Sequence, residues 1–508
     1  MSKIKINGQD LTTQDVVNVA RKGYKVELTE EAIAKVIKAR KLVDELVDNK
    51  ESVYGITTGF GKFSDVPISK EETKDLQRNL IISHACGVGN PFKNDVVKGI
   101  MLLRVNNLAK GHSGVRLETL NTLMEMINKD VYPVIPEKGS LGASGDLAPL
   151  SHMVLVMLGE GEAHFEGVCM TGKEAMDKAG IPTIELTSKE GLALINGTQV
   201  MTSVGALALY DTERLMKLAD VSCALTVEAL NGITDAFDPR LHRVRPHQGQ
   251  MDTAANLLTL LTDSGLTTKQ GEIRVQDAYT LRCTPQIHGA SKDALHYCLD
   301  KVNIEMNSVT DNPIIFPDDR VVFSGGNFHG QPMALPFDFL GIALAEIANV
   351  SERRTERLVN PQLSGMPAFL TEKGGLHSGF MIAQYASAAL VSENKVLAHP
   401  ASVDSIPSSA NQEDHVSMGT IGARKAAEIL ENVMNVIAIE ILSACQAIDF
   451  KDPALLGKGT KVAYNVVREK VTKLTDDRVM YKDINAVYDL VKSHAIIDAV
   501  EETIGTLN

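Results

Sequence analysis

Residues 139–152 read GSLGASGDLAPLSH, with small residues on both sides of Ser144. This is not a phosphate-binding loop, because no lysine stands where G-x-x-x-x-G-K-[ST] requires one. It is not a nucleophile elbow either, because Asp146 takes the place of the last glycine in G-x-S-x-G. A triad of Ser144, Asp146 and His152 is compatible with the spacing, but the strand–turn–helix context is missing. A turn of small residues before a helix is the plain alternative.

The triplet Ala143-Ser144-Gly145 also permits a reaction of the backbone itself. The amide nitrogen of Gly145 can attack the carbonyl carbon of Ala143 and close a five-membered ring through Ser144. Loss of one water from the ring, and of the serine hydroxyl as a second water, leaves an exocyclic methylidene. Gly145 lets the backbone fold back with no Cβ in the way, and Ala143 adds little bulk. The product is a strong electrophile, which no ordinary side chain offers.

This stretch resembles the cofactor-forming segment of the aromatic amino acid ammonia-lyase and aminomutase family. The resemblance implies that Ala143, Ser144 and Gly145 form 4-methylidene-imidazol-5-one (MIO) autocatalytically, with Ser144 becoming a dehydroalanine. It implies no external cofactor. No cluster of His, Cys, Asp or Glu has the spacing of metal ligands, so the sequence also predicts no required metal. The resemblance also implies a mainly α fold, with a small mixed α/β N-terminal domain on a long, nearly parallel central helix bundle like that of fumarase and aspartase.

The composition is that of an acidic globular chain. Of 508 residues, 44% are hydrophobic and 23% are charged, which suits a large core. The net charge of −13, without a long run of Lys or Arg, argues against nucleic acid and acidic membranes as partners. The N-terminus lacks the apolar core of a signal peptide. The six cysteines form no C-x-x-C pair, which favours buried free thiols and a cytoplasmic location.

Helical patterns dominate after about residue 65. Long apolar helices are predicted over 198–230, 333–360 and 418–448, and apolar residues around much of their circumference favour the centre of a bundle. The apolar run at 379–391 is too short to span a bilayer and predicts a buried helix. A boundary near residue 110 gives a mixed N-terminal domain over 1–110 and a mainly helical domain over 111–508.

Shorter signals mark helix starts and strands. Ser69 with Glu72, and Thr187 with Glu190, have the spacing of capping boxes. Four short apolar or alternating runs predict strands: KIKIN at 3–7, GYKVEL at 23–28, PIIF at 313–316 and RVVFSG at 320–325.

Further segments match the same family. In VYGITTGFG, the resemblance implies a glycine-hinged lid whose Tyr54 is the catalytic acid or base; a surface loop with an aromatic anchor is the alternative. In RVQDAYTLRCTPQIHG, Gln276, Tyr279 and Arg282 would share one face if the segment is helical. The family implies that Arg282 holds the substrate carboxylate and that Tyr279 and Gln276 border the ring, whereas a solvated polar face is the alternative.

Two more loops complete the expected site. The resemblance implies that Asn196, in ALINGTQV, hydrogen-bonds the cofactor or substrate, and that Phe328, in FSGGNFHGQP, lies beside the cofactor. A turn amide and a loop aromatic that closes the core are the respective alternatives. The segment NSVTDNP, at 307–313, is a further family-like element that we expect to support the site.

The substrate is predicted from two positions. Phenylalanine-type members carry an apolar pair after the NLI-like helix and tyrosine-type members carry His-Leu, whereas Ser83-His84 here resembles the histidine type. Glu413, in SSANQEDHVSMG, could accept a hydrogen bond from an imidazole N–H. His84 and Glu413 would be left unsatisfied around a plain benzyl ring, at a cost of about 1–3 kcal/mol each.

The sequence therefore predicts elimination of ammonia from L-histidine to give trans-urocanate, in a homotetramer whose sites draw residues from more than one subunit, as the family implies. Tyrosine ammonia-lyase and MIO-dependent 2,3-aminomutase activities remain open, because elimination and amine migration share their early steps. An inactive helical scaffold is the alternative outside enzymes. The pair His242 and His247 is flanked by arginines and a proline, which makes a poor metal site.

Overall fold

The computed structural model describes residues 2–49, 51, 53, 55–56, 58 and 72–508. Helices make up 61% of the chain, so the mainly α prediction is confirmed. The chain forms two compact units, each built from separated stretches of sequence: unit 1 holds Met1–Tyr210, Leu299–Asp338 and Pro400–Arg424, and unit 2 holds Asp211–Cys298, Phe339–His399 and Lys425–Asn508. The boundary predicted near residue 110 falls inside unit 1 and stays a prediction.

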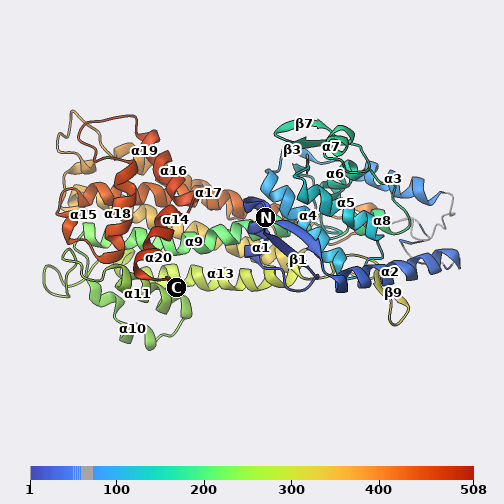
Figure 1. The fold of residues 1–508 in the computed structure, drawn as a ribbon. Helices are drawn as coiled ribbons and strands as arrows, with labels where there is room; N and C mark the ends of the chain where they lie inside the picture. Colours follow the sequence, from blue (N-terminus) through green and yellow to red (C-terminus); the bar gives the residue numbers. More distant parts are fainter. Residues whose placement is uncertain (1, 50, 52, 54, 57, 59–71) are drawn as a thin grey trace. The chain divides into compact units, whose positions relative to one another are not determined.

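Unit 1 contains all the strands that the structure describes, in four small sheets. β1 and β2 pair in parallel, side by side in Figure 1, and α1 connects them. β3 pairs with β5, β4–β6–β7 form an antiparallel sheet, and β8 pairs with β9. The strands are β1 (Lys3–Ile6), β2 (Lys25–Leu28), β3 (Val88–Pro91), β4 (Tyr132–Pro133), β5 (Pro136–Lys138), β6 (Glu162–Phe165), β7 (Val168–Thr171), β8 (Ile314–Phe316) and β9 (Val321–Phe323). The four strand predictions are confirmed, and β3 to β7 were not predicted.

Of the helices wholly within unit 1, α1, α2 and α7 begin at a threonine whose hydroxyl accepts from a backbone N–H of the first turn. Thr12 and Asp15 form a capping box on α1, and Gly23 ends that helix at φ 71°. The helices wholly within unit 1 are α1 (Thr13–Lys22), α2 (Glu30–Asp48), α3 (Thr73–His84), α4 (Asn94–Ala109), α5 (Leu117–Asn128), α6 (Leu147–Met157), α7 (Gly172–Lys178) and α8 (Glu190–Ile195). The cap of α3 is Glu72, without a side-chain hydrogen bond, and Ser69 lies outside the described residues. The predicted cap of α8 is half confirmed, because Glu190 accepts from the N–H of Thr187 at 2.9 Å but the N-cap residue is Lys189.

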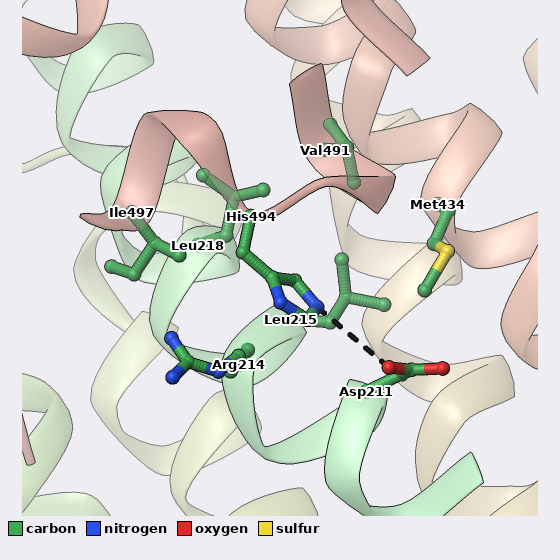
Figure 2. Close-up of a pocket in the computed structure, with 8 residues that line it drawn as sticks. All are labelled: Asp211, Arg214, Leu215, Leu218, Met434, Val491, His494 and Ile497. Carbon is green, nitrogen blue, oxygen red and sulfur yellow. Dashed lines mark ion pairs between the residues drawn. The ribbon is translucent and has the colours of Figure 1, made fainter. Parts of the chain in front are cut away.

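Among its described residues, unit 2 has helices joined by loops and no strand of a sheet. Its own helices are α10 (Pro239–Arg243), α11 (Gln248–Leu260), α12 (Tyr279–Arg282), α15 (Pro361–Ser364), α16 (Met381–Leu397), α18 (Lys458–Lys470), α19 (Met480–Lys492) and α20 (Ala495–Ile504). Short 3-10 turns stand at Thr234–Phe237, Ala368–Leu370 and Pro453–Leu455. A small pocket contains His494, whose Nε2 lies 3.7 Å from Oδ1 of Asp211. Figure 2 shows this ion pair and the side chains that line the pocket. The remaining lining residues are Arg214, Leu215, Leu218, Met434, Val491 and Ile497.

Four long helices have residues in both units, and three of them are the long helices predicted from sequence: α9 (Gln199–Ala229), α13 (Thr284–Met306), α14 (Gln331–Val359) and α17 (Gly419–Ile448). Close packing in unit 1 depends on Gly205, because a Cβ there would lie 2.0 Å from the ring of Phe337. α14 is the one described helix long and apolar enough to cross a membrane, but 67% of its apolar window is buried, so it is a core helix.

The prediction of a buried helix over 379–391 is wrong. α16 is a helix, but Ile382 and Tyr385 are each 61% exposed and Val396 is 74% exposed. The buried positions are Ala383, Ser387 and Asn394, so the small and polar side chains face the protein and the large apolar ones face outward.

The six cysteines are free thiols, and the expectation that they are buried is only partly confirmed. Cys223, Cys298 and Cys445 are buried, Cys283 is half-buried, and Cys86 and Cys169 are exposed. Both exposed cysteines lie beside short elements of unit 1, where there is little core to cover them.

Candidate active site

The cyclisation triplet lies in a loop that is paired tightly with a second glycine. Gly145 has φ +75° and forms a parallel bridge with Gly197. The N–H of Asp146 donates to the carbonyl of Gly197 at 2.8 Å, and the N–H of Gly197 donates to the carbonyl of Ser144 at 3.4 Å. A Cβ on Gly145 would lie 2.1 Å from that Gly197 oxygen, so this position requires glycine.

This backbone geometry fits the formation of an MIO group. The bridge uses the peptide groups on either side of Gly145, so the N–H of Gly145 itself takes no part in it. That nitrogen is the atom that must attack the Ala143 carbonyl. The left-handed conformation at Gly145 folds the chain back, as ring closure requires, and Ser144 is half-buried with its hydroxyl in a polar contact.

The buried carboxylate of Asp146 fastens the loop to two long helices. It accepts hydrogen bonds from the N–H groups of Val200 (3.0 Å) and Met201 (2.9 Å) in the first turn of α9. It also accepts from the hydroxyls of Ser140 (2.7 Å) and Thr420, the latter at the start of α17. Burial raises the pKa of Asp146, and these four donors oppose the rise. The positive end of the α9 dipole further suits a carboxylate at this place.

Glu413 contacts the triplet, and His84 lies close enough to Glu413 to be affected by its charge. The hydroxyl of Ser144 donates to Oε1 of Glu413 at 3.0 Å. His84 is the last residue of α3 and is half-buried, and its Nδ1 lies 3.1 Å from the hydroxyl of Ser83. Burial lowers the pKa of His84, partly offset by the Leu80 carbonyl and the Glu413 charge. The net effect of these surroundings favours the neutral form of the His84 imidazole.

Asn196 and Phe328 are connected through a residue that sequence reasoning did not single out. The buried side chain of Asn196, which ends α8, donates to the carbonyl of Asn312 at 2.8 Å. Oδ1 of Asn312 accepts from the N–H of Gly325 at 2.7 Å, in the loop that carries the half-buried Phe328. The family-like segment 307–313 thus supports both loops, which was the expectation from sequence.

Gln276, Tyr279 and Arg282 lie in unit 2, and they do not share a helical face. α12 begins at Tyr279, so Gln276 lies in extended chain before it and is exposed. The extended chain is held by the buried carboxylate of Asp277, which accepts from the N–H of Ile233 at 2.6 Å. Tyr279 is exposed and stacks against the guanidinium of Arg282, whose Cζ is 4.6 Å from the ring centroid. The Nε of Arg282 donates to the carbonyl of Asp277 at 2.9 Å.

The sequence also predicted the catalytic acid or base and the absence of a required metal. Tyr54, the expected acid or base, lies outside the described residues. Within residues 2–49 and 72–508, and at the few described positions between them, no group of three or more His, Cys, Asp or Glu side chains could hold a metal ion.

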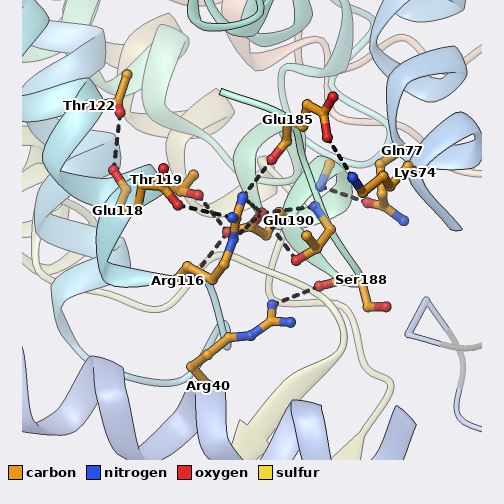
Figure 3. Close-up of polar contacts among 12 residues, drawn as sticks. Arg40, Lys74, Gln77, Arg116, Glu118, Thr119, Thr122, Glu185, Ser188 and Glu190 are labelled. Atoms are coloured by element: carbon orange, nitrogen blue, oxygen red, sulfur yellow. Dashed lines mark hydrogen bonds and ion pairs between the residues drawn. The ribbon is translucent and has the colours of Figure 1, made fainter. Parts of the chain in front are cut away.

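A buried carboxylate supports the helices that present His84 and Asn196. Figure 3 shows Glu190, the first residue of α8, beside Arg116. Glu190 is fully buried and accepts from the guanidinium of Arg116 at 2.8 Å, from its backbone N–H at 2.9 Å, and from the hydroxyl of Thr119 at 2.5 Å. The next residue, Gly191, donates its N–H to the buried side chain of Gln77 on α3 at 2.7 Å. The predicted capping box was the only sequence signal for this network.

A second set of buried charged groups lies next to Asn312. Lys189 and Asp311 form a fully buried ion pair at 2.6 Å, and Oδ1 of the same Asp311 accepts from the N–H of Asn312 at 2.7 Å. The guanidinium of Arg104, also buried, donates to the carbonyl of Ala193 at 3.0 Å. Burial lowers the pKa of Arg104 to about 10, although the nearby Asp311 and Asp146 oppose this shift. These buried groups hold α8 in place, and with it the residues that follow it, Asn196 and Gly197.

Comparison with known proteins agrees with this geometry. A family model described as aromatic amino acid lyase matches residues 11–469. The chain belongs to this family, whose members use the MIO group. A histidine ammonia-lyase of Alkaliphilus oremlandii is 68% identical over 504 residues, which is 99% of each chain.

Two solved structures have the same fold. The crystal structure of histidine ammonia-lyase from Trypanosoma cruzi has a TM-score of 0.93 at 43% identity, covering 99% of this chain and 95% of that one. The structure of tyrosine aminomutase from Streptomyces globisporus has a TM-score of 0.96 at 39% identity and full coverage of both chains. The fold therefore serves both elimination and amine migration.

Proposed function

We propose that this chain is a histidine ammonia-lyase, which converts L-histidine to trans-urocanate and ammonia in histidine degradation. The single observation that carries the proposal is the 3.0 Å contact between Ser144 and Glu413, because it puts a histidine-type carboxylate at the cyclisation triplet. The full-length relatives named histidine ammonia-lyase support the same substrate.

The triplet Ala143-Ser144-Gly145 would hold the MIO group, which supplies an electrophile toward the substrate. Asp146 keeps the triplet loop in place, and Asn196 presents its amide close to the paired backbone of Gly197. We assign Phe328 to the border of the same group, as the family implies.

The remaining residues bind the substrate and move its proton. A neutral His84 and the Glu413 carboxylate hydrogen-bond the imidazole, and an aromatic ring without nitrogen would leave both unsatisfied. Arg282 binds the carboxylate in the bidentate manner that suits a guanidinium. Gln276 and Tyr279 border the ring, and Tyr54 accepts the β-proton.

We also propose a cytoplasmic homotetramer that shares residues between subunits. The large apolar side chains on the outer face of α16, at Ile382, Tyr385 and Val396, support self-association, because monomers rarely expose such a face. Light scattering at several protein concentrations tests this assembly, and a monomer at all of them would refute it.

The activity is tested by incubation with L-histidine, L-tyrosine and L-phenylalanine in parallel. We expect near-ultraviolet absorbance from urocanate with L-histidine alone. A 2,3-aminomutase is the second candidate, favoured by the aminomutase of the same fold, and it would give a β-amino acid without the conjugated chromophore. Intact mass separates both from an inactive scaffold, since a chain that has formed the group is lighter by two waters.

A further inference from the structure

The segment that carries Glu413 contains an unusual turn. Ser408 and Glu413 form an antiparallel bridge, with N–H to carbonyl distances of 3.0 and 3.3 Å. Between them, Ser409, Ala410 and Asn411 all have positive φ, at 51°, 53° and 65°. Residues other than glycine adopt this left-handed conformation rarely, because Cβ approaches the neighbouring carbonyl oxygen. Such backbone persists only where the surrounding structure holds it, and it is most common at functional sites.

The bridge brings one hydroxyl onto the Glu413 carboxylate. The hydroxyl of Ser408 donates to Oε2 of Glu413 at 2.8 Å, while Oε1 of the same carboxylate accepts from Ser144 at 3.0 Å. One oxygen is therefore anchored within the turn and the other faces the triplet. A glutamate side chain loses rotamer entropy when it is fixed, so a carboxylate that is already anchored binds a ligand at a lower entropic cost.

The rest of the segment is fixed at its two ends. The carboxylate of Asp338 accepts from the N–H groups of Ala401 at 3.0 Å and Ser402 at 2.7 Å. The N–H of Val416 donates to the hydroxyl of Ser405 at 3.1 Å. Most side chains between these anchors are exposed, so packing contributes little to the direction of the Glu413 carboxylate. The direction of the Glu413 carboxylate therefore depends on its hydrogen bond from Ser408.

We propose that Ser408 is a positioning residue, which orients the Glu413 carboxylate toward the substrate imidazole through the bridge across the left-handed turn. The inference rests on the proposed function, in which Glu413 binds the imidazole of L-histidine. Ser408 itself touches no substrate.

The test compares Ser408→Ala, Ser408→Thr and the control Ser402→Ala with the wild-type enzyme. Ser402 lies in the same segment and is anchored through its backbone N–H. Ser402→Ala therefore removes the same hydroxyl group as Ser408→Ala but leaves the anchor of Ser402 in place. We expect Ser408→Ala to keep the two-water mass deficit and to lower kcat/KM for L-histidine about tenfold, mainly through KM, since a hydrogen bond to a charged group is lost. Ser408→Thr restores the hydroxyl and most of the affinity, and Ser402→Ala behaves as wild type.

Equal kinetics for Ser408→Ala and Ser402→Ala would overturn the inference, as would a Ser408→Thr enzyme as impaired as Ser408→Ala. A crystal structure of Ser408→Ala gives a readout that needs no substrate. We expect the Glu413 carboxylate to turn away from the triplet, and an unchanged carboxylate would overturn the inference. A wild-type enzyme that forms no urocanate would overturn the proposed function instead, and the crystal structure would still decide the role of Ser408.

Discussion

Replacing Gly145 with alanine tests the claim that the triplet loop depends on close pairing of two backbones. The new Cβ would lie 2.1 Å from the carbonyl oxygen of Gly197, and both partners are backbone atoms, so no side-chain movement relieves the overlap. The positive φ of 75° adds about 1–2 kcal/mol of strain. Loss of the two bridging hydrogen bonds adds about 1 kcal/mol each. We expect these contributions to add to a loss of about 3–4 kcal/mol.

A matched control separates the strain from the overlap. Gly167 has φ +79°, and nothing lies within 4 Å of the Cβ that alanine would add there. Gly167→Ala should therefore cost about 1–2 kcal/mol in urea unfolding followed by circular dichroism. We also expect Gly145→Ala, but not Gly167→Ala, to lack the two-water mass deficit. Equal losses of stability in the two variants, or a normal mass deficit in Gly145→Ala, would refute the reasoning.

Three further predictions follow from the described contacts. Ser144→Ala should show neither the mass deficit nor turnover, by intact-mass measurement and urocanate absorbance, and retained activity would contradict the proposed chemistry. Glu190→Gln should lower unfolding free energy by about 2 kcal/mol in urea, because the buried ion pair with Arg116 loses its charge, and an unchanged midpoint would count against that role. Burial lowers the pKa of His288, whose Nδ1 lies 2.8 Å from Asp220, so the folded state favours the neutral ring. The stabilisation by the neutral His288 ring is present above the unfolded-state pKa of about 6.5 and is lost as the pH falls below that value. The urea midpoint of the wild-type protein should therefore drop on acidification. The midpoint of His288→Gln should drop less.

The long helices could be predicted from sequence because their apolar residues repeat with helical spacing over many turns. The strands β3 to β7 could not, since Val88–Pro91 contains a glycine and a proline, and Tyr132–Pro133 is only two residues long. β3, β4 and β5 exist through pairing with distant segments, which leaves no local pattern, whereas β6 and β7 form a local hairpin that the sequence analysis missed. The exposed face of α16 was missed for a related reason: apolar content does not reveal which face a neighbour covers.

The candidate site was predictable where a residue carries a recognisable motif. Ser144, His84 and Glu413 were found through their flanking residues, and the structure brings Ser144 and Glu413 into contact. Supporting residues such as Gln77 and Ser408 were missed because a single polar residue gives no periodic signal, and Asn312 was reached only as part of the family-like segment 307–313. Their roles depend on hydrogen bonds to segments up to 114 and 116 residues away, as for Gln77 with Gly191 and Asn196 with Asn312.

The discontinuous make-up of unit 1 has a consequence for the order of events during synthesis. The triplet leaves the ribosome long before Glu413 and Thr420, which belong to the last stretch of that unit. Until they arrive, Ser144 lacks its acidic neighbour and Asp146 lacks one of its four donors. On the proposed function, we therefore expect a nascent or truncated chain to keep an ordinary serine, and the reactive group to arise only after most of the polypeptide has been made.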